Sequence, residues 1–575
     1  MNKFEGKIQG GRLLAKSMAE KGIKRVFSLP GGFINPIYIG CEEYGIEVVR
    51  VRSEQEAGFL ANGWAQVTRE PTVAIAEPSG VTNYVSAVAE AYISWQPVIF
   101  LGIRSIFHRL DQKGFKEIPE ERILEPITKY SILINDGQRI PEFFDKAYDI
   151  AVNQPTGPVF LSIPINFLYS GRWQLPEKGV KGTYDRAPEK VRIHRPYPNP
   201  DDVKLVKEEL KKARKPVIIA SPEVYWAHAE EELMDFVDRA EIPVLVPPWH
   251  NPPIDLTRPS CMGLADIHIN HASRLIGEEA DLVLILGGYL DYSIDFGEPP
   301  LFNDAAKMIT VNNSPRMAAD NHRADIQIVG DLKAFVNQLK QDVESLRADP
   351  GWITSFRSAR EEDNKKTLAD ANLNEVPVHP LQLCLDVLHS LGEEDYVVID
   401  GGDIDGWFHT ALQIWSLEGR KVKGILHSGA FHQLGVGVSF ATAAKMSHPE
   451  SKVVLVSGDG TFGLNPGLPL ETAIYYQLPI TVVVSNDARW GQIEEQQDAL
   501  WGRHYATDSR LVPFHEMIKG AGVYGELVED PNDLKPALER CFSSKVPSLI
   551  DVRVSTPRST ITQGLVDKRE RSSLE

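Results

Sequence analysis

Short apolar runs alternate with amphipathic segments along most of this chain, which is the pattern of alternating β-strands and α-helices. In the N-terminal third, the pattern predicts helices at 10–21 and 53–65. The apolar runs around them predict strands at 24–28, 46–51, 72–76 and 97–101. Because strands and helices alternate, we expect a mostly parallel, doubly wound sheet.

The same alternation returns twice further along the chain. Two stretches with few apolar residues, 170–200 and 347–374, are interpreted as linkers. Strands are expected between them at 216–220, 243–246, 282–286 and 308–311. The sequence therefore predicts an α/β protein with three consecutive doubly wound parallel-sheet domains. Their expected bounds are 1–185 (N-terminal), 195–345 (central) and 375–556 (C-terminal), followed by a basic tail at 557–575.

Composition narrows the class of partner. The chain has 575 residues, of which 42% are hydrophobic and 24% are charged. No apolar segment approaches the roughly 20 residues that span a bilayer, and the N-terminus has no continuous apolar core of a secretory signal. The net charge of −18 disfavours nucleic acid. The chain has four isolated cysteines, Cys41, Cys261, Cys384 and Cys541, which disfavour disulfides and zinc. We therefore expect a cytoplasmic protein, and with nucleic acid disfavoured we expect it to act on a small molecule.

Polar residues follow two apolar runs in the C-terminal third. The run 453–456 leads to Gly458-Asp459-Gly460, and the run 480–484 leads to Asn486-Asp487. Neighbouring parallel strands present such residues at one edge of the sheet, where open α/β sheets bind ligands. Oxygen ligands beside a glycine turn suit Mg²⁺ and a diphosphate group. A lone Gly-Asp-Gly is usually only a turn, so the pair of strand ends carries the prediction.

Several motifs in one order connect this edge to a known family. The chain resembles, over nearly its full length, the thiamine-diphosphate-dependent enzymes of the acetohydroxyacid synthase, oxalyl-CoA decarboxylase and 2-hydroxyacyl-CoA lyase type. The motifs that carry the resemblance lie at 52–57 with 61–65, 77–83, 114–117, 429–437 and 458–491. The resemblance implies a pyrimidine-binding domain, a central domain and a diphosphate-binding domain, in that order.

On the pyrimidine side, the resemblance implies that Glu54 contacts N1′ of the aminopyrimidine ring. A carboxyl group in an apolar surrounding can share a proton with a ring nitrogen; the alternative is a solvated carboxylate at a helix N-terminus. Ser53 stands where the family usually has His, which puts a relay through that histidine in doubt. Further cofactor contacts are expected at Gly31, Pro78 and Asn83.

On the diphosphate side, the resemblance implies cofactor contacts at Gly402, Asp403, Gly458, Asp459 and Gly460. Leu434 falls where the family has the apolar residue that wedges between the two cofactor rings. His432 is unusual in that loop, and it either faces the substrate or has a structural role.

The metal ligands implied by the resemblance are Asp459, a second side chain and a backbone carbonyl. Spacing from Asp459 selects Asn486 as the second ligand, whereas two other anchors select Asp487. The carbonyl then comes from Arg489, or from Ala488 in the other register. An apparent extra residue within 464–468 explains the disagreement and favours Asp487.

Two further residues are candidates for chemistry. Glu494, after the metal loop, is a candidate acid/base, and the alternative is an exposed helix carboxylate. Lys116 stands where the family usually has Gln. It is either a cation that meets an anionic substrate group or an ordinary surface lysine.

The resemblance implies a carbon–carbon lyase that cleaves a 2-hydroxyacyl-CoA to a ketone or aldehyde and formyl-CoA. The alternatives are an acetohydroxyacid-synthase-like carboligase, a 2-oxo acid or oxalyl-CoA decarboxylase, and a catalytically silent cofactor-binding protein. The expected cofactors are thiamine diphosphate and Mg²⁺, and FAD or ADP in the central domain stays open. The tail is either a frayed end or a lid over an acyl-CoA substrate. A homodimer or homotetramer is expected.

Overall fold

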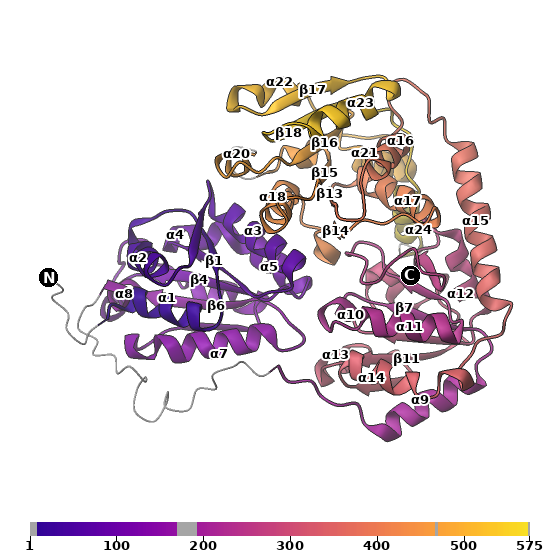
Figure 1. The fold of residues 1–575 in the computed structure, drawn as a ribbon, viewed down its shortest axis with the longest axis horizontal. Coiled ribbons are helices and arrows are strands. Elements are labelled where there is room, and N and C mark those ends of the chain that lie inside the picture. The colour runs from indigo at the N-terminus through magenta and orange to yellow at the C-terminus, as the bar shows by residue number, and fades with distance from the viewer. Residues whose placement is uncertain (1–7, 170–192, 466–469, 573–575) are drawn as a thin grey trace. The chain divides into compact units, whose positions relative to one another are not determined.

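The strands of the protein form three parallel sheets of six strands each within the described residues. The computed structural model describes residues 8–169, 193–465 and 470–572 (Figure 1). This arrangement confirms the predicted α/β class with three doubly wound sheets. Most of the predicted linker at 170–200 lies outside the described residues, and so does the greater part of 464–468.

The first sheet has the strand order β2-β1-β3-β4-β6-β5. Every residue of β3 and β4 is buried, which explains why these strands read as continuous apolar runs. Its strands are β1 (Arg25–Ser28), β2 (Glu47–Arg50), β3 (Thr72–Ala76), β4 (Val98–Arg104), β5 (Tyr130–Leu133) and β6 (Val159–Pro164). Its helices are α1 (Gly10–Glu20), α2 (Asn35–Glu43), α3 (Glu54–Thr68), α4 (Pro78–Val81), α5 (Val85–Ile93), α6 (Glu120–Leu124), α7 (Ile140–Val152) and α8 (Ile165–Tyr169).

The second sheet has the order β12-β11-β10-β7-β8-β9. Its strands are β7 (Pro216–Ala220), β8 (Val244–Val246), β9 (Cys261–Leu264), β10 (Leu282–Leu286), β11 (Lys307–Asn312) and β12 (Ile326–Val329). Its helices are α9 (Pro200–Lys212), α10 (Glu223–Trp226), α11 (Glu230–Ala240), α12 (Arg274–Glu279), α13 (Pro315–Asp320) and α14 (Leu332–Lys340).

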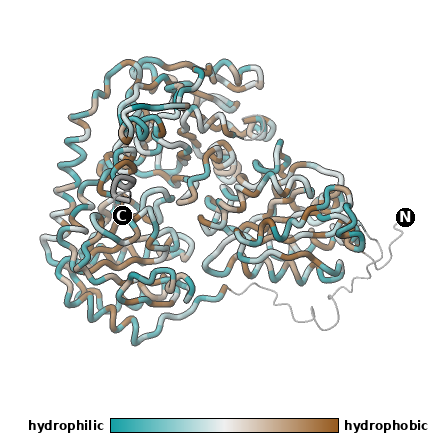
Figure 2. The backbone as a smooth tube through the Cα atoms, turned by 180° about the vertical axis from the view of Figure 1, so that it is seen from behind, coloured by the Kyte–Doolittle hydropathy of each residue, from teal (hydrophilic) through white to brown (hydrophobic). Residues whose placement is uncertain are grey.

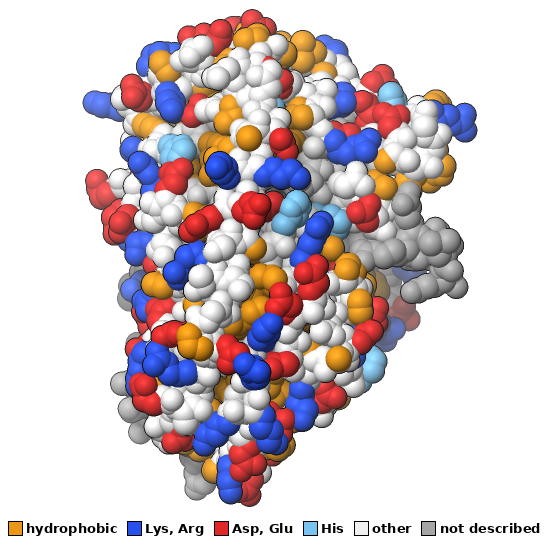
Figure 3. Space-filling model, turned by 90° about the vertical axis from the view of Figure 1, so that its right-hand side faces the viewer, with side chains coloured by type: hydrophobic (Ala, Val, Ile, Leu, Met, Phe, Trp, Pro, Cys, Tyr) orange, Lys and Arg blue, Asp and Glu red, His pale blue; other side chains and the backbone are white. Residues whose placement is uncertain are grey.

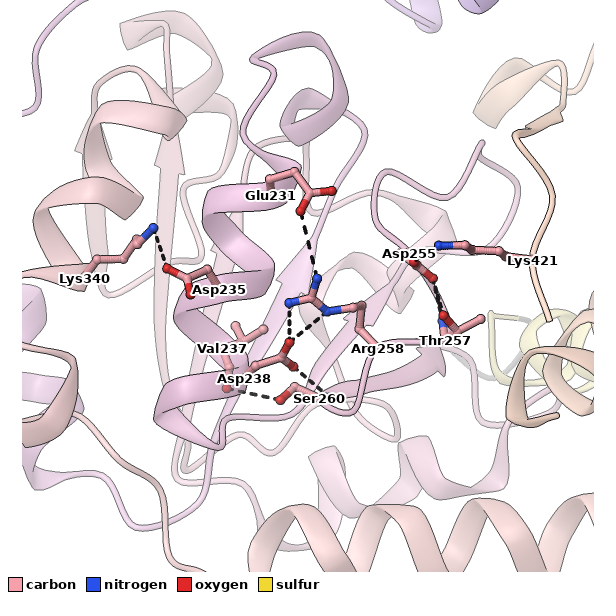
Figure 4. A network of polar contacts seen from close by, with 10 residues as sticks. All are labelled: Glu231, Asp235, Val237, Asp238, Asp255, Thr257, Arg258, Ser260, Lys340 and Lys421. Atoms are coloured by element: carbon pink, nitrogen blue, oxygen red, sulfur yellow. Dashed lines mark hydrogen bonds and ion pairs between the residues drawn. The ribbon is translucent and has the colours of Figure 1, made fainter. Parts of the chain in front are cut away.

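Charged side chains tie the helices of the second sheet to its loops (Figure 4). Arg258 donates to Asp238 of α11 through Nε at 2.9 Å and Nη2 at 2.6 Å. Asp238 also accepts from the backbone N–H of Ser260 at 3.2 Å, just before β9. Lys340 of α14 pairs with Asp235 of α11 at 2.6 Å. Helix α11 is therefore joined both to α14 and to the segment before β9.

The third sheet has the order β14-β13-β15-β16-β18-β17, which repeats the order of the first sheet. Its strands are β13 (Tyr396–Asp400), β14 (Gly424–Leu426), β15 (Val453–Gly458), β16 (Thr481–Asn486), β17 (Tyr524–Val528) and β18 (Ser548–Arg553). The helices are α16 (Pro380–His389), α17 (Asp403–Leu417), α18 (Gly437–Ser447), α19 (Asp459–Phe462), α20 (Glu471–Tyr475), α21 (Gly491–Trp501), α22 (Phe514–Met517), α23 (Pro531–Phe542) and α24 (Thr560–Ser572).

The chain divides into two compact units. The first contains the described residues of Met1–His194, Phe431–Ser447 and Pro466–Thr472, and the second contains the rest.

Hydrophobic residues concentrate in the strands, and helices carry polar residues on their outer sides (Figure 2). On the face drawn in Figure 3, acidic and basic side chains are interspersed.

The stretch 347–374, predicted as a linker, is mostly helix α15 (Trp352–Asp370). Trp352 and Phe356 of this helix are buried in the core of the second sheet. The buried Arg360 donates to the carbonyls of Cys261 at 3.3 Å and Gln413 at 3.0 Å. A few buried residues therefore hold this otherwise polar helix against the protein. The overall polar composition of the segment does not reveal these buried positions.

Candidate active site

Glu54 is the first residue of α3 and lies at the edge of the first sheet. Its carboxyl is buried, with 9% of the residue exposed, and Oε2 accepts from Asn83 Nδ2 at 2.9 Å. Gly80 lies against it: a Cβ at Gly80 would stand 2.2 Å from Oε1, so a larger residue there would displace the carboxyl. Ser53 caps α3 by accepting from the backbone N–H of Glu56 at 3.1 Å. Glu54 is thus a covered carboxyl group with one fixed partner.

Glu77 and Lys116 form an ion pair at the same edge. Glu77 follows β3, and its Oε1 accepts from the backbone N–H of Phe33 at 2.8 Å, just after Gly31 and β1. The Lys116 ammonium also lies 5.8 Å from the Phe33 ring centroid and 5.5 Å from that of Phe115. Because the strand order reverses between β1 and β3, this is the ligand-binding crevice of such a sheet. Lys116 is therefore held in place, and Glu77 is a partner that the sequence analysis missed.

The turns after β13 and β15 meet at the equivalent crevice of the third sheet, where the strand order also reverses. Gly402 and Asp403 follow β13, whereas Gly458 ends β15 and Asp459 begins α19. The Asp403 carboxyl accepts from Trp407 Nε1 at 3.0 Å and from Thr562 Oγ1 at 3.3 Å. Burial raises the pKa of Asp403 to about 6. The Asp403 carboxyl therefore joins the start of α17 to α24.

β15 and β16 pair in parallel, so Asp459 and Asp487 come together as the two strand ends predicted. Burial and the neighbouring Asp487 raise the pKa of Asp459 to about 7. Burial also raises the pKa of Asp487, although Arg489 opposes the shift. A buried and a half-buried carboxyl group that repel each other form a donor set that fits a divalent cation.

Asn486 has a different environment. It is the last residue of β16, and its Nδ2 donates to the Val512 carbonyl at 3.0 Å and to Asp551 at 2.9 Å. Its Oδ1 is buried without a hydrogen-bond partner among the described residues. The Nδ2 bonds leave Asn486 Oδ1 turned to no other group among the described residues, whereas Asp487 accepts from the backbone N–H and Nε of Arg489, so both side chains stay candidates for the second ligand.

Glu494 and Glu495 are both buried on α21, each with 8% exposed, so the alternative of two exposed carboxylates is wrong. Glu494 accepts from Arg489 Nη1 at 2.6 Å and from Thr507 Oγ1 at 3.0 Å. Burial and Asp403 raise the pKa of Glu495 to about 8. The metal loop and α21 are therefore connected through the Arg489–Glu494 ion pair.

The loop before α18 carries Leu434 and His432. Both are half-buried, and His432 has a positive φ of 53°. The start of the loop is fixed within the second unit: Tyr292 Oη donates to the Ala430 carbonyl at 2.9 Å, and the backbone N–H of Gly429 donates to His427 Nδ1 at 2.9 Å. The two contacts come from different elements, so they restrain the loop's entry point.

His427 belongs to a buried cluster that the sequence analysis missed. Its Nε2 lies 2.7 Å from Asp405 Oδ2, and His409 Nδ1 lies 2.9 Å from Asp405 Oδ1. Burial opposes ionisation of Asp405, yet His427 and His409 hold the pKa of that carboxyl far below its usual range. The spacing of Asp405 and His409, four residues apart on α17, was a local signal. No local sequence signal predicted that His427, which follows β14, would approach Asp405.

The tail after Thr556 begins as a packed helix rather than a frayed end. Ile561 and Thr562 of α24 are buried, and Thr562 contacts Asp403 as described above. The side chains at 568, 569 and 571, which made the tail basic, lie outside the described residues. No helix in the described part of the chain is long and apolar enough to cross a membrane.

The fold is that of an α/β protein with three parallel sheets, and polar residues gather at the switch points of the first and third sheets. Family models described as thiamine pyrophosphate enzyme match three regions: the N-terminal TPP binding domain at residues 8–123, the central domain at 203–339 and the C-terminal TPP binding domain at 400–552. The chain belongs to the thiamine pyrophosphate enzyme family, and its cofactor is thiamine diphosphate.

Relatives extend over the full length. Acetolactate synthase large subunit IlvG of Mycobacterium tuberculosis is 30% identical, covering 95% of each chain. The 2-hydroxyacyl-CoA lyase 2 of Danio rerio is 27% identical over 92% of this chain and 89% of its own. A solved thiamine diphosphate-dependent 4-hydroxybenzoylformate decarboxylase of Rhodococcus jostii RHA1 shares the fold at a TM-score of 0.78 and 20% identity, covering 96% of this chain and 100% of that one.

Proposed function

We propose that the protein is a carbon–carbon lyase that cleaves a 2-hydroxyacyl-CoA to a ketone or aldehyde and formyl-CoA. The observation that carries the proposal is the Glu494 ion pair with Arg489 at 2.6 Å. The guanidinium fixes the position of the Glu494 carboxyl group, and a positioned carboxyl group can act as a general base. Cleavage of a 2-hydroxyacyl group requires removal of the hydroxyl proton, whereas a simple decarboxylase needs an acid at this step.

The proposed cofactor contacts divide by the part of the cofactor that they hold. Glu54, oriented by Asn83, contacts the aminopyrimidine ring, and Leu434 supports the angle between the rings. Asp459, Asp487 and the Arg489 carbonyl hold Mg²⁺. Bound thiamine diphosphate would supply the nucleophilic carbon and would delocalise the electron pair left on C1 when the bond breaks. The remaining cofactor contacts in the proposal are Gly31, Pro78, Gly402, Asp403, Gly458 and Gly460.

In the proposed reaction, Glu494 accepts the proton of the 2-hydroxyl group. The bond between C1 and C2 then breaks, the hydroxyl oxygen becomes the carbonyl oxygen of the departing ketone or aldehyde, and C1 keeps the electron pair. Return of one proton to C1 releases formyl-CoA, so protons balance over the cycle. Lys116 and His432 are proposed to face the substrate, with Lys116 oriented by Glu77.

The experiment is incubation of the holoenzyme with a panel of 2-hydroxyacyl-CoA thioesters and 2-oxo acids, followed by detection of formyl-CoA, aldehydes and CO₂. We expect formyl-CoA and the shortened carbonyl compound in equal amounts, and no product without thiamine diphosphate. Glu54→Gln is the matched inactive control, because it keeps the size of the side chain. Release of CO₂ from 2-oxo acids, without formyl-CoA from any thioester, contradicts the lyase proposal.

A second candidate is an acetohydroxyacid-forming carboligase. It is favoured by the relative named acetolactate synthase, which is 30% identical over 95% of both chains. Formation of a 2-hydroxy-2-methyl-3-oxo acid from a 2-oxo acid in the same panel identifies this activity.

We also propose a homodimer or homotetramer as the working assembly, since the resemblance places the pyrimidine and diphosphate sides of a site on two chains. Light scattering of the purified protein measures its mass. A monomer that is fully active at nanomolar concentration contradicts the proposal.

A further inference from the structure

The second sheet has the topology of a dinucleotide-binding fold. In chain order its strands are β7 to β12, and their spatial order corresponds to 6-5-4-1-2-3. This is the order 3-2-1-4-5-6 seen from the other edge, which binds nucleotides at the switch point between strands 1 and 4. In this protein the switch point lies between β7 and β10, at their C-terminal ends.

The turn after β7 lacks the features that a pyrophosphate needs. In dinucleotide-binding folds this turn is rich in glycine, so the backbone approaches the phosphates and donates its N–H groups. Here the turn reads Ser221-Pro222-Glu223 and contains no glycine. Pro222 has no N–H to donate, and the N–H of Ser221 is bonded to the Leu286 carbonyl at 3.1 Å.

Glu223 places its own carboxylate at the switch point. Its Oε2 accepts from the backbone N–H of Gly288 at 3.2 Å, after β10, and its Oε1 accepts from that of Asn313 at 3.1 Å, after β11. Asn312 Nδ2 approaches Oε2 at 3.5 Å. Only 2% of Glu223 is exposed. The backbone donors at the ends of β10 and β11 are therefore already occupied by the Glu223 carboxyl group.

The segment after β10 is built closely around this carboxylate. Gly287 has a φ of 76°, and a Cβ there would lie 2.4 Å from the Cβ of Glu223. The Gly288 carbonyl accepts from Asn312 Nδ2 at 2.8 Å and from Asn321 Nδ2 at 3.0 Å. The polar groups of the switch point are thus bonded to one another, and the residues present do not fit a nucleoside diphosphate.

We infer that the Glu223 carboxyl group takes the place of a nucleotide phosphate, and that the central domain of this protein binds neither FAD nor ADP. The Glu223 carboxylate links the ends of β7, β10 and β11, a task that a bound diphosphate performs in sheets of this topology. The protein accordingly needs thiamine diphosphate but no nucleotide.

The first test uses the wild-type protein loaded with thiamine diphosphate and Mg²⁺, so that the diphosphate site of the third sheet is filled. The purified protein is denatured, and the released small molecules are examined for FAD and ADP. Each nucleotide is then titrated into the holoenzyme by calorimetry. We expect no co-purified nucleotide and no saturable binding up to about millimolar concentration. Stoichiometric FAD or ADP, or saturable binding in the micromolar range, overturns the inference.

The second test removes the Glu223 carboxyl group. Glu223→Ala leaves the two N–H groups without an acceptor, so we expect its Tm to fall by several degrees and to recover by about 2–4 °C with inorganic phosphate or ADP. Glu231→Ala is the matched control, because that carboxylate lies on the neighbouring α11 with its side chain 84% exposed. We expect a wild-type Tm and no phosphate response from it.

A Glu223→Ala protein with a wild-type Tm, or one that phosphate and ADP do not stabilise, contradicts the role of the carboxylate. If Glu223→Ala does not fold, Glu223→Gln replaces it: the amide fills the same volume, so we expect a lowered Tm without recovery by phosphate. A wild-type Tm for Glu223→Gln counts against the inference.

Discussion

We predict that cation binding at the proposed Asp459–Asp487 pair depends steeply on pH. Burial and Asp487 raise the pKa of Asp459 from 3.8 to about 7, and a cation binds the ionised form. Below that pKa, each pH unit lowers the ionised fraction tenfold, which costs about 1.4 kcal/mol of binding free energy. The cation affinity is therefore highest well above pH 7, where Asp459 is ionised, and it falls as the pH drops through 7.

The magnitude distinguishes this site from an ordinary carboxylate. Between pH 8 and pH 5, a carboxyl with a pKa near 7 loses about 100-fold in cation affinity, or roughly 2.7 kcal/mol. A carboxyl with its usual pKa near 3.9 stays more than nine-tenths ionised at pH 5, and affinity changes by less than about 10%. The neighbouring Asp487 steepens the effect, because its pKa is also raised.

The assay is titration of the cofactor-free protein with Mn²⁺, which takes the same oxygen ligands as Mg²⁺ and whose free ion is measured by electron paramagnetic resonance. Leaving out thiamine diphosphate avoids titration of its own phosphates. Asp487→Asn removes one charge, so we expect weaker binding at pH 8 and a smaller dependence on pH. Asp533→Asn, an exposed residue in the first turn of α23, is the control and should match the wild type.

A change of less than twofold between pH 8 and pH 5 refutes the reasoning about Asp459. Loss of Mn²⁺ binding in Asn486→Ala, with normal binding in Asp487→Asn, assigns the second ligand to Asn486 instead.

Four other variants test the remaining contacts of the site. Glu54→Gln should lower kcat at least 100-fold with little change in Tm, and full activity contradicts its role at the aminopyrimidine ring. Leu434→Ala should reduce kcat more than thiamine diphosphate affinity; equal losses refute the wedge. Tyr292→Phe removes the hydrogen bond to the Ala430 carbonyl, so kcat should fall a few-fold while KM and Tm stay nearly unchanged. A lower Tm with an unchanged kcat would contradict this expectation. Truncation after Thr556 should lower Tm by several degrees, because it deletes the buried Ile561 and Thr562, and an unchanged Tm shows that α24 does not stabilise the third sheet.

The polar strand ends are predictable from the sequence because their signals are local. An apolar run followed by Gly458-Asp459-Gly460 indicates where a buried strand stops and what stands at its end. Two such runs separated by a helix imply parallel neighbours. The register of β15 and β16 bears this out. The same logic located Glu54 at the start of α3.

Other parts of the candidate site depend on residues that are distant in the sequence. The surroundings of Asn486 depend on Val512 and Asp551, which accept hydrogen bonds from its amide N–H groups. The ion pair of Lys116 with Glu77 joins positions 39 residues apart. No spacing rule relates such partners, because they meet only when separate strands align.

The sequence by itself determined the class of fold, the family and the strand ends at which chemistry is expected, since periodicity, glycine turns and motif order are written along the chain. Tertiary structure alone decided what surrounds each polar group. Glu223 reads as an unremarkable glutamate after a strand, yet the ends of β10 and β11 bring two backbone N–H groups to its carboxylate. Burial and neighbouring charge set the behaviour of an ionisable group, and both are properties of the packed sheets rather than of the local sequence.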